Sequence, residues 1–237
     1  MTQATGDGFE PVRQLWAGRF QGVISTQSHA EPGYPFGSLV PYCLDRAGRP
    51  VFLFSHLAQH AKNLAADPRC SLTLAEPVPG DVQQGQRLTC IGECTPLDPS
   101  EAKSLGRYLR YFPEGRMYAE QLNFRPYRLE PRRFHYNGGF AAARWLGRER
   151  VLRANPLDEE TEASLAAALS RDQGPWLAAL LPAPEGADAS PSTPRRVAGI
   201  DPWGLDLGCG DRLRRVPFPR AMTDAQAIAA YVSGLVT

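Results

Sequence analysis

The strongest constraint on the fold of this chain is a series of short apolar, β-prone runs separated by turns that contain glycine or proline. Such runs occupy residues 22–26, 39–44, 51–54, 70–75 and 87–94. Runs of this length that are bounded by turn residues are typical of strands. Residues 39–44 and 51–54 flank the turn DRAGRP, which predicts a β-hairpin. The N-terminal part of the chain is therefore expected to be rich in β-structure.

Other elements of this part follow from apolar spacing and from helix stop signals. Ser55 is placed to cap a helix over residues 56–67, in which Leu57, Ala61 and Leu64 share one face. The segment 28–38 contains several glycines and prolines and is expected to be a loop. The remaining predictions are helices over residues 11–20 and 100–111 and a strand pair, 132–136 with 140–146, around Asn137-Gly138-Gly139.

After residue 150 the sequence changes character. Residues 157–181 predict a helix that Gly174-Pro175 breaks in two, and residues 182–194 predict a flexible link. Two strands, 197–207 and 212–218, and a closing helix over 223–235 with Thr223 as its N-cap complete this part. We therefore expect a β-rich domain over residues 1–150 and a smaller α+β domain over residues 151–237.

The overall charge limits the classes of partner. The 237 residues include 26 Lys plus Arg and 25 Asp plus Glu, so general binding to nucleic acid is not expected. No apolar run approaches the length of a membrane span, so no membrane partner is expected. The five cysteines are scattered and odd in number, which favours a reducing, cytoplasmic compartment.

Charge is nevertheless uneven along the chain. Residues 125–153 carry eight arginines and two acids, a local net charge of +6, whereas residues 154–190 carry seven acids and one arginine, a net charge of −6. Blocks of this kind occur as ordinary surface mosaics. The arginine-rich block is also suited to holding a phosphate or carboxylate.

The start of the helix after residue 54 is the clearest candidate binding site. Its backbone N–H groups and partial positive charge favour an anion such as a phosphate, and Ser55, His60, Lys62 and Asn63 lie off the apolar stripe. The alternative is an ordinary capped helix with a polar outer face. His56 and His60 have the i, i+4 spacing of metal ligands, but a third ligand is missing nearby.

Several other conspicuous residues are expected to be structural. Cys90 and Cys94 lie ~13 Å apart if they are on a strand, which is too far for a disulfide or a shared metal. His135 lies in an arginine-rich strand and is expected to have its hydrogen bonds satisfied within the fold. The four tryptophans are expected to be packing residues: Trp16, Trp145, Trp176 and Trp203.

Taken together, several motifs resemble one known superfamily. They are GVIST, PFGSLVPYCLDRAGRPVFLFSHLAQHAKNLAADPRCSLTL, QRLTCIGECTPLD and YNGGFAAARWL. This order is similar to the FMN-binding split-barrel superfamily, which includes pyridoxamine 5′-phosphate oxidase. The string from Ser55 to Pro68 and the segment from Gly138 to Leu146 resemble its haem-utilisation branch most. The C-terminal part resembles a small α+β domain that often follows this barrel.

The resemblance implies an α+β protein with a six-stranded antiparallel split β-barrel that forms a homodimer, with ligand sites at the dimer interface. The expected function is that of an FMN-dependent oxidoreductase acting on a small-molecule substrate. By position, the flavin contacts fall on Gly37, Ser38 and Leu39, and a further polar contact falls on Arg87. The FMN phosphate is expected at Ser55, His60, Lys62 and Asn63.

Some positions depart from the superfamily's pattern and keep alternatives open. Gln59 and His60 stand where the oxidase members carry basic residues, which disfavours a pyridoxamine phosphate oxidase proper. An alternative ligand is haem, bound or degraded on the same barrel with the arginine-rich block holding its propionates. The haem-degrading relatives place an axial histidine near the chain end, whereas here no histidine follows His135. Haem would then use His135, His60, His56 or His29, or no histidine. A non-enzymatic regulatory or scaffold protein is the third alternative.

Overall fold

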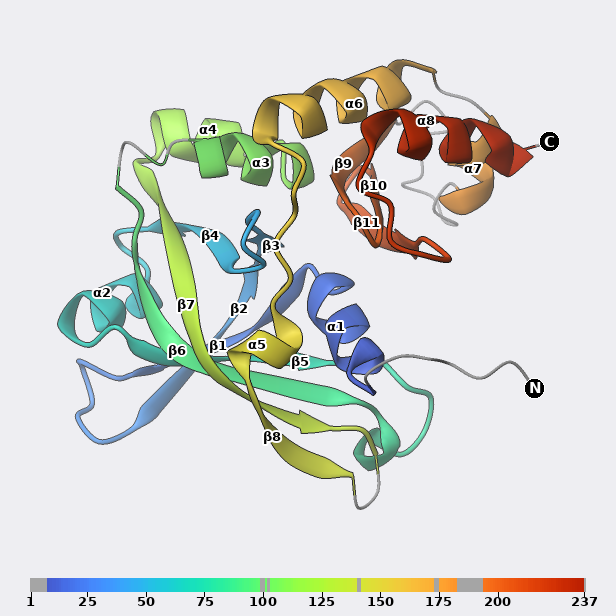
Figure 1. The fold of residues 1–237 in the computed structure, drawn as a ribbon. Coiled ribbons are helices and arrows are strands. Elements are labelled where there is room, and N and C mark those ends of the chain that lie inside the picture. Colours follow the sequence, from blue (N-terminus) through green and yellow to red (C-terminus); the bar gives the residue numbers. More distant parts are fainter. Residues whose placement is uncertain are drawn as a thin grey trace. The chain divides into compact units, whose positions relative to one another are not determined.

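The computed structural model describes residues 8–98, 101, 103–139, 142–172, 175–182 and 194–236. By contacts, the chain divides into two compact units (Figure 1). Unit 1 contains residues 1–102 and 115–153, and unit 2 contains residues 103–114 and 154–237. Residues 103–114 therefore leave unit 1 between two of its elements and pack in unit 2. The predicted link over residues 182–194 falls almost wholly outside the described residues, as does Gly174.

Unit 1 is built on one antiparallel sheet, which Figure 1 shows to be strongly curled. Within the described residues its strands are β1 (Gln21–Gln27), β2 (Pro35–Pro41), β3 (Cys43–Leu44), β4 (Pro50–Ser55), β5 (Arg69–Ala75), β6 (Arg87–Pro96), β7 (Phe124–Asn137) and β8 (Ala143–Gly147). They pair in the order β2-β1-β5-β6-β7-β4-β3, and β8 pairs with the last residues of β7. Its helical elements are α1 (Glu10–Ala17), α2 (Gln59–Ala66), α4 (Gly115–Gln121), α5 (Arg148–Val151) and the short 3-10 turn η1 (Val82–Gln84).

The sheet has a buried inner face and an exposed outer face. The inner face carries a row of paired core side chains that crosses five strands: Ile24, Leu72, Cys90, Phe134 and Leu146. Trp16 of α1 packs edge-on against Phe134, with ring centroids 4.9 Å apart. Since side chains alternate along a strand, the residues between these core positions point to the outer face.

Two predictions for the first strands are wrong. Residues 35–38 are strand and not loop, because β2 pairs along its whole length with β1. The run 39–44 is not one hairpin strand, since it divides between β2 and β3 at Tyr42, whose backbone N–H donates instead to the Phe20 carbonyl. The hairpin to β4 is made by the two residues of β3 alone.

The longest strand, β7, was expected only over residues 132–136. Its first half contains Pro126 and Pro131, which are sequence signals against a strand because proline cannot donate a ladder hydrogen bond. At Pro131 the register with β6 shifts between Ile91 and Gly92, forming a bulge. Gly92 is required there, since any β-carbon at this position would collide with the Glu130 carbonyl.

The helix after β4 begins later than expected. Ser55 is not its N-cap: α2 begins at Gln59, its N-cap position is Ala58, and no side chain caps it. Ser55 instead accepts a hydrogen bond from the Leu57 N–H at 3.2 Å, within a turn that precedes the helix. The apolar face of α2 packs into the unit 1 core through Ala61 and Leu64.

Unit 2 combines a three-stranded sheet with four α-helices within the described residues. The strands are β9 (Arg195–Asp201), β10 (Gly204–Cys209) and β11 (Arg212–Pro217), in the order β11-β10-β9. The helical elements are α3 (Lys103–Tyr111), α6 (Glu159–Asp172), α7 (Pro175–Leu180), α8 (Ala225–Ser233) and the 3-10 turn η3 (Gly234–Val236). The run 197–207 is therefore two strands that turn at Pro202-Trp203, and the N-cap of α8 is Asp224 and not Thr223.

A buried cluster of charged side chains joins α3 to the rest of unit 2. Glu162 of α6, fully buried, accepts hydrogen bonds from Arg107 of α3 and from the Ile200 N–H of β9. The Tyr111 hydroxyl donates to Asp206 of β10 at 2.6 Å. Asp206 also pairs with Arg215 of β11 at 2.9 Å.

Burial of the Asp206 carboxyl raises its pKa, while Arg215 beside it opposes that rise.

None of the helices within the described part of the chain is both long and apolar enough to span a bilayer.

Candidate functional site

The eight residues predicted to contact a cofactor do not form one group in a single chain. Gly37 and Leu39 of β2 and Arg87 of β6 alternate with inward-facing neighbours and so lie on the outer face of the sheet. Ser38 pairs with the core residue Ile24 and faces inward. Of the other four, Ser55 is the last residue of β4, and His60, Lys62 and Asn63 belong to α2, whose apolar face packs on the inner side.

The side chain of Asn63 has a structural role. Its side chain is fully buried, and its Nδ2 donates to the Thr26 hydroxyl of β1 at 2.9 Å. Its Oδ1 accepts from the His29 N–H at 3.0 Å and from Gln59 Nε2 at 2.8 Å. These contacts tie α2 to β1 and to the loop after it, and they occupy the groups that a phosphate would need.

His60 and Lys62 differ in their access to solvent. The His60 ring packs edge-on against Phe54, with centroids 4.4 Å apart, and burial lowers the pKa of its imidazole. Its Nε2 is buried and has no hydrogen-bond partner among the described residues. Lys62 is exposed, and no described residue pairs with its ammonium. Of the four inner residues, Lys62 is thus the one best placed to meet a ligand.

The outer face carries a continuous row of side chains across six strands. In strand order the row is Leu39, Val23, Thr73, Thr89, His135 and Trp145. Three of these are large apolar side chains with much of their surface in solvent: Leu39 is 68% exposed, Trp145 50% and Val23 40%. Leu39 and Val23 are neighbours on β2 and β1, whereas Trp145 lies four strands from Val23, beyond Thr73, Thr89 and His135.

Two residues in this row contradict the expectation that they are structural. Trp145 is half exposed and not a core residue. His135 packs against it with ring centroids 5.0 Å apart, and within the described part of the chain neither imidazole nitrogen has a hydrogen-bond partner. His135 is therefore not the satisfied histidine that its surroundings in the sequence suggested.

Arginines flank the row on both sides. Arg133, two residues before His135 on β7, places its guanidinium over the Trp145 ring, 5.3 Å from the centroid. Arg87 lies across from Asn137, two residues beyond His135, and one of its nitrogens donates to the Val82 carbonyl at 2.9 Å. The two guanidinium groups thus lie on opposite sides of the row, one over Trp145 and the other on the Val82 carbonyl. We refer to the row with Arg87 and Arg133 as the outer-face site.

The other candidate chemistry is limited. Within the described residues no cluster of His, Cys, Asp and Glu has the composition of a metal site. None of the five cysteines is in a disulfide, all five are buried, and burial raises the pKa of the Cys90 thiol. Cys90 and Cys94 are core residues, as expected.

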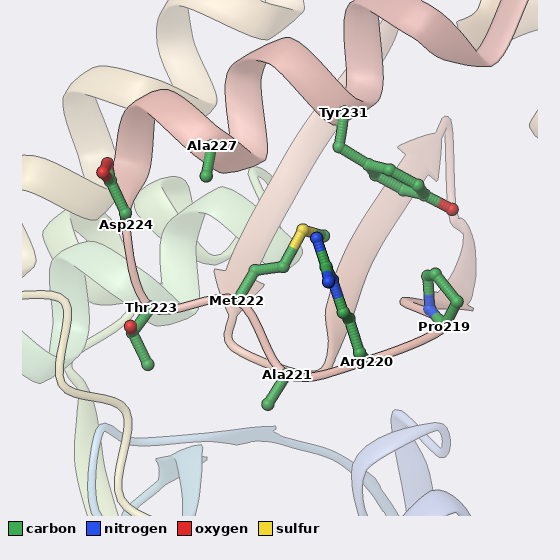
Figure 2. A pocket seen from close by; sticks show the side chains of 8 residues that line it. All are labelled: Pro219, Arg220, Ala221, Met222, Thr223, Asp224, Ala227 and Tyr231. Carbon is green, nitrogen blue, oxygen red and sulfur yellow. The ribbon is translucent and has the colours of Figure 1, made fainter.

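A cavity of about 550 Å³ lies in unit 2, between α8 and the segment that precedes it (Figure 2). Its lining residues are Pro219, Arg220, Ala221, Met222, Thr223, Asp224, Ala227 and Tyr231. Figure 2 shows the Arg220 side chain extending beside Met222 toward α8. None of the eight residues predicted to contact a cofactor lines this cavity.

Comparison with known proteins identifies the family to which the barrel belongs. The family model described as the CREG β-barrel matches residues 8–151. The chain belongs to this family. The match confirms the predicted split barrel of the pyridoxamine phosphate oxidase-like type and the α+β fold class. In this chain the barrel of the CREG family is the eight-stranded curled sheet of unit 1, in which β3 contributes two residues.

Among characterised relatives, the chain is 34% identical over 135 residues to the non-canonical heme oxygenase HOZ, chloroplastic, of Arabidopsis thaliana. That alignment covers 56% of this chain and 41% of the plant protein, so the chain matches about two fifths of that relative's length.

Two solved structures resemble nearly the whole chain. One is Atu2129 of Agrobacterium tumefaciens, of unknown function, with a TM-score of 0.76, 24% identity and 98% coverage of both chains. The other is a heme binding protein of Mycobacterium smegmatis, with a TM-score of 0.57, 25% identity and coverage of 98% of this chain and 97% of that one.

Proposed function

We propose that this protein binds haem on the outer face of its barrel. The observation that carries the proposal lies in the outer-face site, where the half-exposed Trp145 ring has the Arg133 guanidinium over it. Haem is a flat apolar macrocycle with two propionate carboxylates at one edge, so it needs both features. Arginine is suited to carboxylates because its fork of N–H groups matches their geometry. The names of the Arabidopsis and Mycobacterium relatives support haem over other flat ligands.

The residues present fit this ligand. Trp145 would cover part of one face of the macrocycle, and the Arg133 guanidinium beside its ring would pair with a propionate. Thr73 and Thr89, farther along the row, share one hydroxyl hydrogen bond of 3.1 Å. Bound haem supplies an iron centre whose chemistry is tuned by its axial ligand and by the polarity around it.

A haem titration tests the proposal. We expect the wild-type protein to give a Soret band that saturates at one haem per chain. Trp145→Asp places a carboxylate where the macrocycle would lie and is expected to weaken binding at least ~10-fold, since an unpaired charge is costly to cover. Leu57→Asp is the control, because Leu57 is an exposed apolar side chain (68%) that lies in the turn before α2. Failure of the wild type to shift the haem spectrum would exclude the proposal.

Haem degradation is the activity that we propose to follow from binding, as in the plant relative's name. The assay adds an external reductant and oxygen to the haem-loaded protein and follows the Soret band. Loss of the band with release of iron, suppressed in Trp145→Asp, would support an oxygenase. A stable band would limit the function to haem binding.

FMN is the second candidate, and one observation favours it. The N-terminus of α2 has no side-chain cap, and the exposed Lys62 ammonium lies in its first turn. Both would attract a phosphate. Fluorescence titration of FMN with wild type and Lys62→Ala tests this candidate, with Arg116→Ala on α4 as the control for loss of one exposed charge. Equal affinities in all three proteins would reject it.

The expected homodimer is part of the same proposal. A second copy seated on the outer face would cover the side of the haem that faces solvent, as a ligand at a dimer interface requires. Mass measurement in solution, with and without haem, tests this. A cytoplasmic location is also proposed, and the five free thiols of the structure are consistent with a reducing compartment.

A further inference from the structure

We propose that the free edge of β2 pairs with the same strand of a second copy of this chain, so that the two sheets join into one. Among the described strands of unit 1, β2 lies at the end of the sheet and pairs with β1 alone. The proposed function places a second copy against the haem, on the outer face. The contact along the edge uses a different surface and does not depend on that function.

The hydrogen bonds at the two ends of the β1–β2 ladder show which backbone groups of β2 point away from β1. The Ser28 N–H donates to the Tyr34 carbonyl, and the Tyr42 N–H donates to the Phe20 carbonyl, each at 2.9 Å. The register between these two pairs is unbroken. Hydrogen-bonded and non-hydrogen-bonded pairs alternate in an antiparallel ladder, so the even-numbered residues of β2 bond to β1. The odd-numbered residues therefore point their N–H and C=O groups toward the free edge.

The N–H groups of this edge belong to Gly37 and Leu39. Within the described residues no hydrogen bond takes up either of them. Pro35 and Pro41, the other odd-numbered residues of β2, have no N–H to donate. An antiparallel copy in register about Ser38 sets Gly37 opposite the partner's Leu39, so each free N–H meets a carbonyl. Pro35 then faces the partner's Pro41, and no donor at the ends is left without an acceptor.

The side chains of β2 suit the same register. Gly37 and Leu39 both lie on the outer face, so the Leu39 side chain, 68% exposed, would cover the partner's Gly37, which has no side chain to obstruct it. On the opposite face Phe36, 38% exposed, would lie across from the partner's Val40. In a single chain Val40 alone among the seven residues of β2 is buried. Pairing therefore covers apolar side chains on both faces of the strand.

The charge of the hairpin also favours an identical partner. Edge strands commonly avoid one another through charged side chains, lysine above all. Neither β1 nor β2 contains Lys, Arg, Asp or Glu, so two copies can approach without repulsion between like charges. The prolines at the ends of β2 protect only those ends and leave residues 36–40 open to pairing.

Mass measurement in solution with a proline variant tests the proposal. We expect wild type to have the mass of two chains and Leu39→Pro the mass of one. Proline at this position removes a donor of the free edge and leaves the hydrogen bonds to β1 in place. Leu39→Ala is the matched control, because it also loses the leucine side chain but keeps the N–H, and it should still form the dimer. Circular dichroism verifies that each variant is folded.

Amide hydrogen exchange of wild type, followed by NMR, decides the question if Leu39→Pro does not fold. We expect slow exchange at Gly37 and Leu39 in the dimer and faster exchange on dilution. A wild type with the mass of one chain, a folded Leu39→Pro that remains a dimer, or fast exchange at both amides would overturn the pairing. Loss of the dimer in Leu39→Ala as well would also overturn it, since side-chain contacts would then hold the copies together. The haem titration tests the proposed function separately, so failure of one proposal leaves the other intact.

Discussion

The replacement Glu162→Gln tests the claim that α3 is an integral part of unit 2. The Glu162 carboxylate is fully buried and is shared by Arg107 and by Arg110, whose Nη2 lies 3.3 Å away. Glutamine keeps the size of the side chain and one acceptor oxygen but removes the charge that faces two guanidinium groups. Removing one partner of a buried ion pair typically costs about 3–5 kcal/mol, and we expect about 3 kcal/mol here because the amide retains an acceptor.

Urea denaturation followed by tryptophan fluorescence measures this cost, since Trp176 is buried in unit 2. Glu160→Gln is the matched control, because Glu160 lies on the same helix but is exposed, and surface changes of this kind stay within about 0.5 kcal/mol. If Glu162→Gln and Glu160→Gln unfold at the same urea concentration, the buried cluster does not hold α3 in place.

Three further predictions concern unit 1. Burial lowers the pKa of His60, so the unfolded chain takes up a proton at higher pH than the folded chain. The free energy of unfolding is therefore unaffected by this group above pH ~6.5 and falls as the pH drops below that value. The melting temperature of His60→Phe should fall less than that of wild type between pH 7 and pH 5. An equal loss in both proteins would contradict this. Asn63→Ala removes the partners of buried polar groups and should lower the free energy of unfolding, measured in urea, by about 1–3 kcal/mol. Its haem affinity should not change. Unchanged stability would refute the structural role of Asn63. Gly92→Ala should lower the free energy of unfolding by about 1–3 kcal/mol, because its β-carbon meets the Glu130 carbonyl. Gly234→Ala is the control and should change the stability little, because the space around Gly234 is open. Equal stabilities of the two variants would show that the bulge adapts.

The short strands were the part of the fold that could be predicted from the sequence. The runs at 22–26, 70–75 and 87–94 alternate or are apolar over lengths that only strands use, and the structure places β1, β5 and β6 there. The first half of β7 could not be predicted in this way, because Pro126 and Pro131 are signals against a strand. The placement of α3 in unit 2 also has no local signal, since an amphipathic helix shows that it packs but not against which core.

The candidate site was predicted in part. Gly37, Leu39 and Arg87 were named separately, and the structure places them on one face. Their relation to His135 depends on a register that joins residues more than 100 positions apart, from Val23 to Trp145, which no local pattern contains. The half-exposed Trp145 carried one available signal, because an alternating strand with Leu146 inside must place its neighbour outside.

The central claim is that haem lies on the outer face of the barrel, and the position of the iron tests it most directly. Crystals of the haem-loaded protein, measured at the iron absorption edge, would give an anomalous peak at the metal. We expect that peak over the outer face of the sheet, near Trp145 and Arg133. A peak beside α2, or within unit 2, would contradict the account.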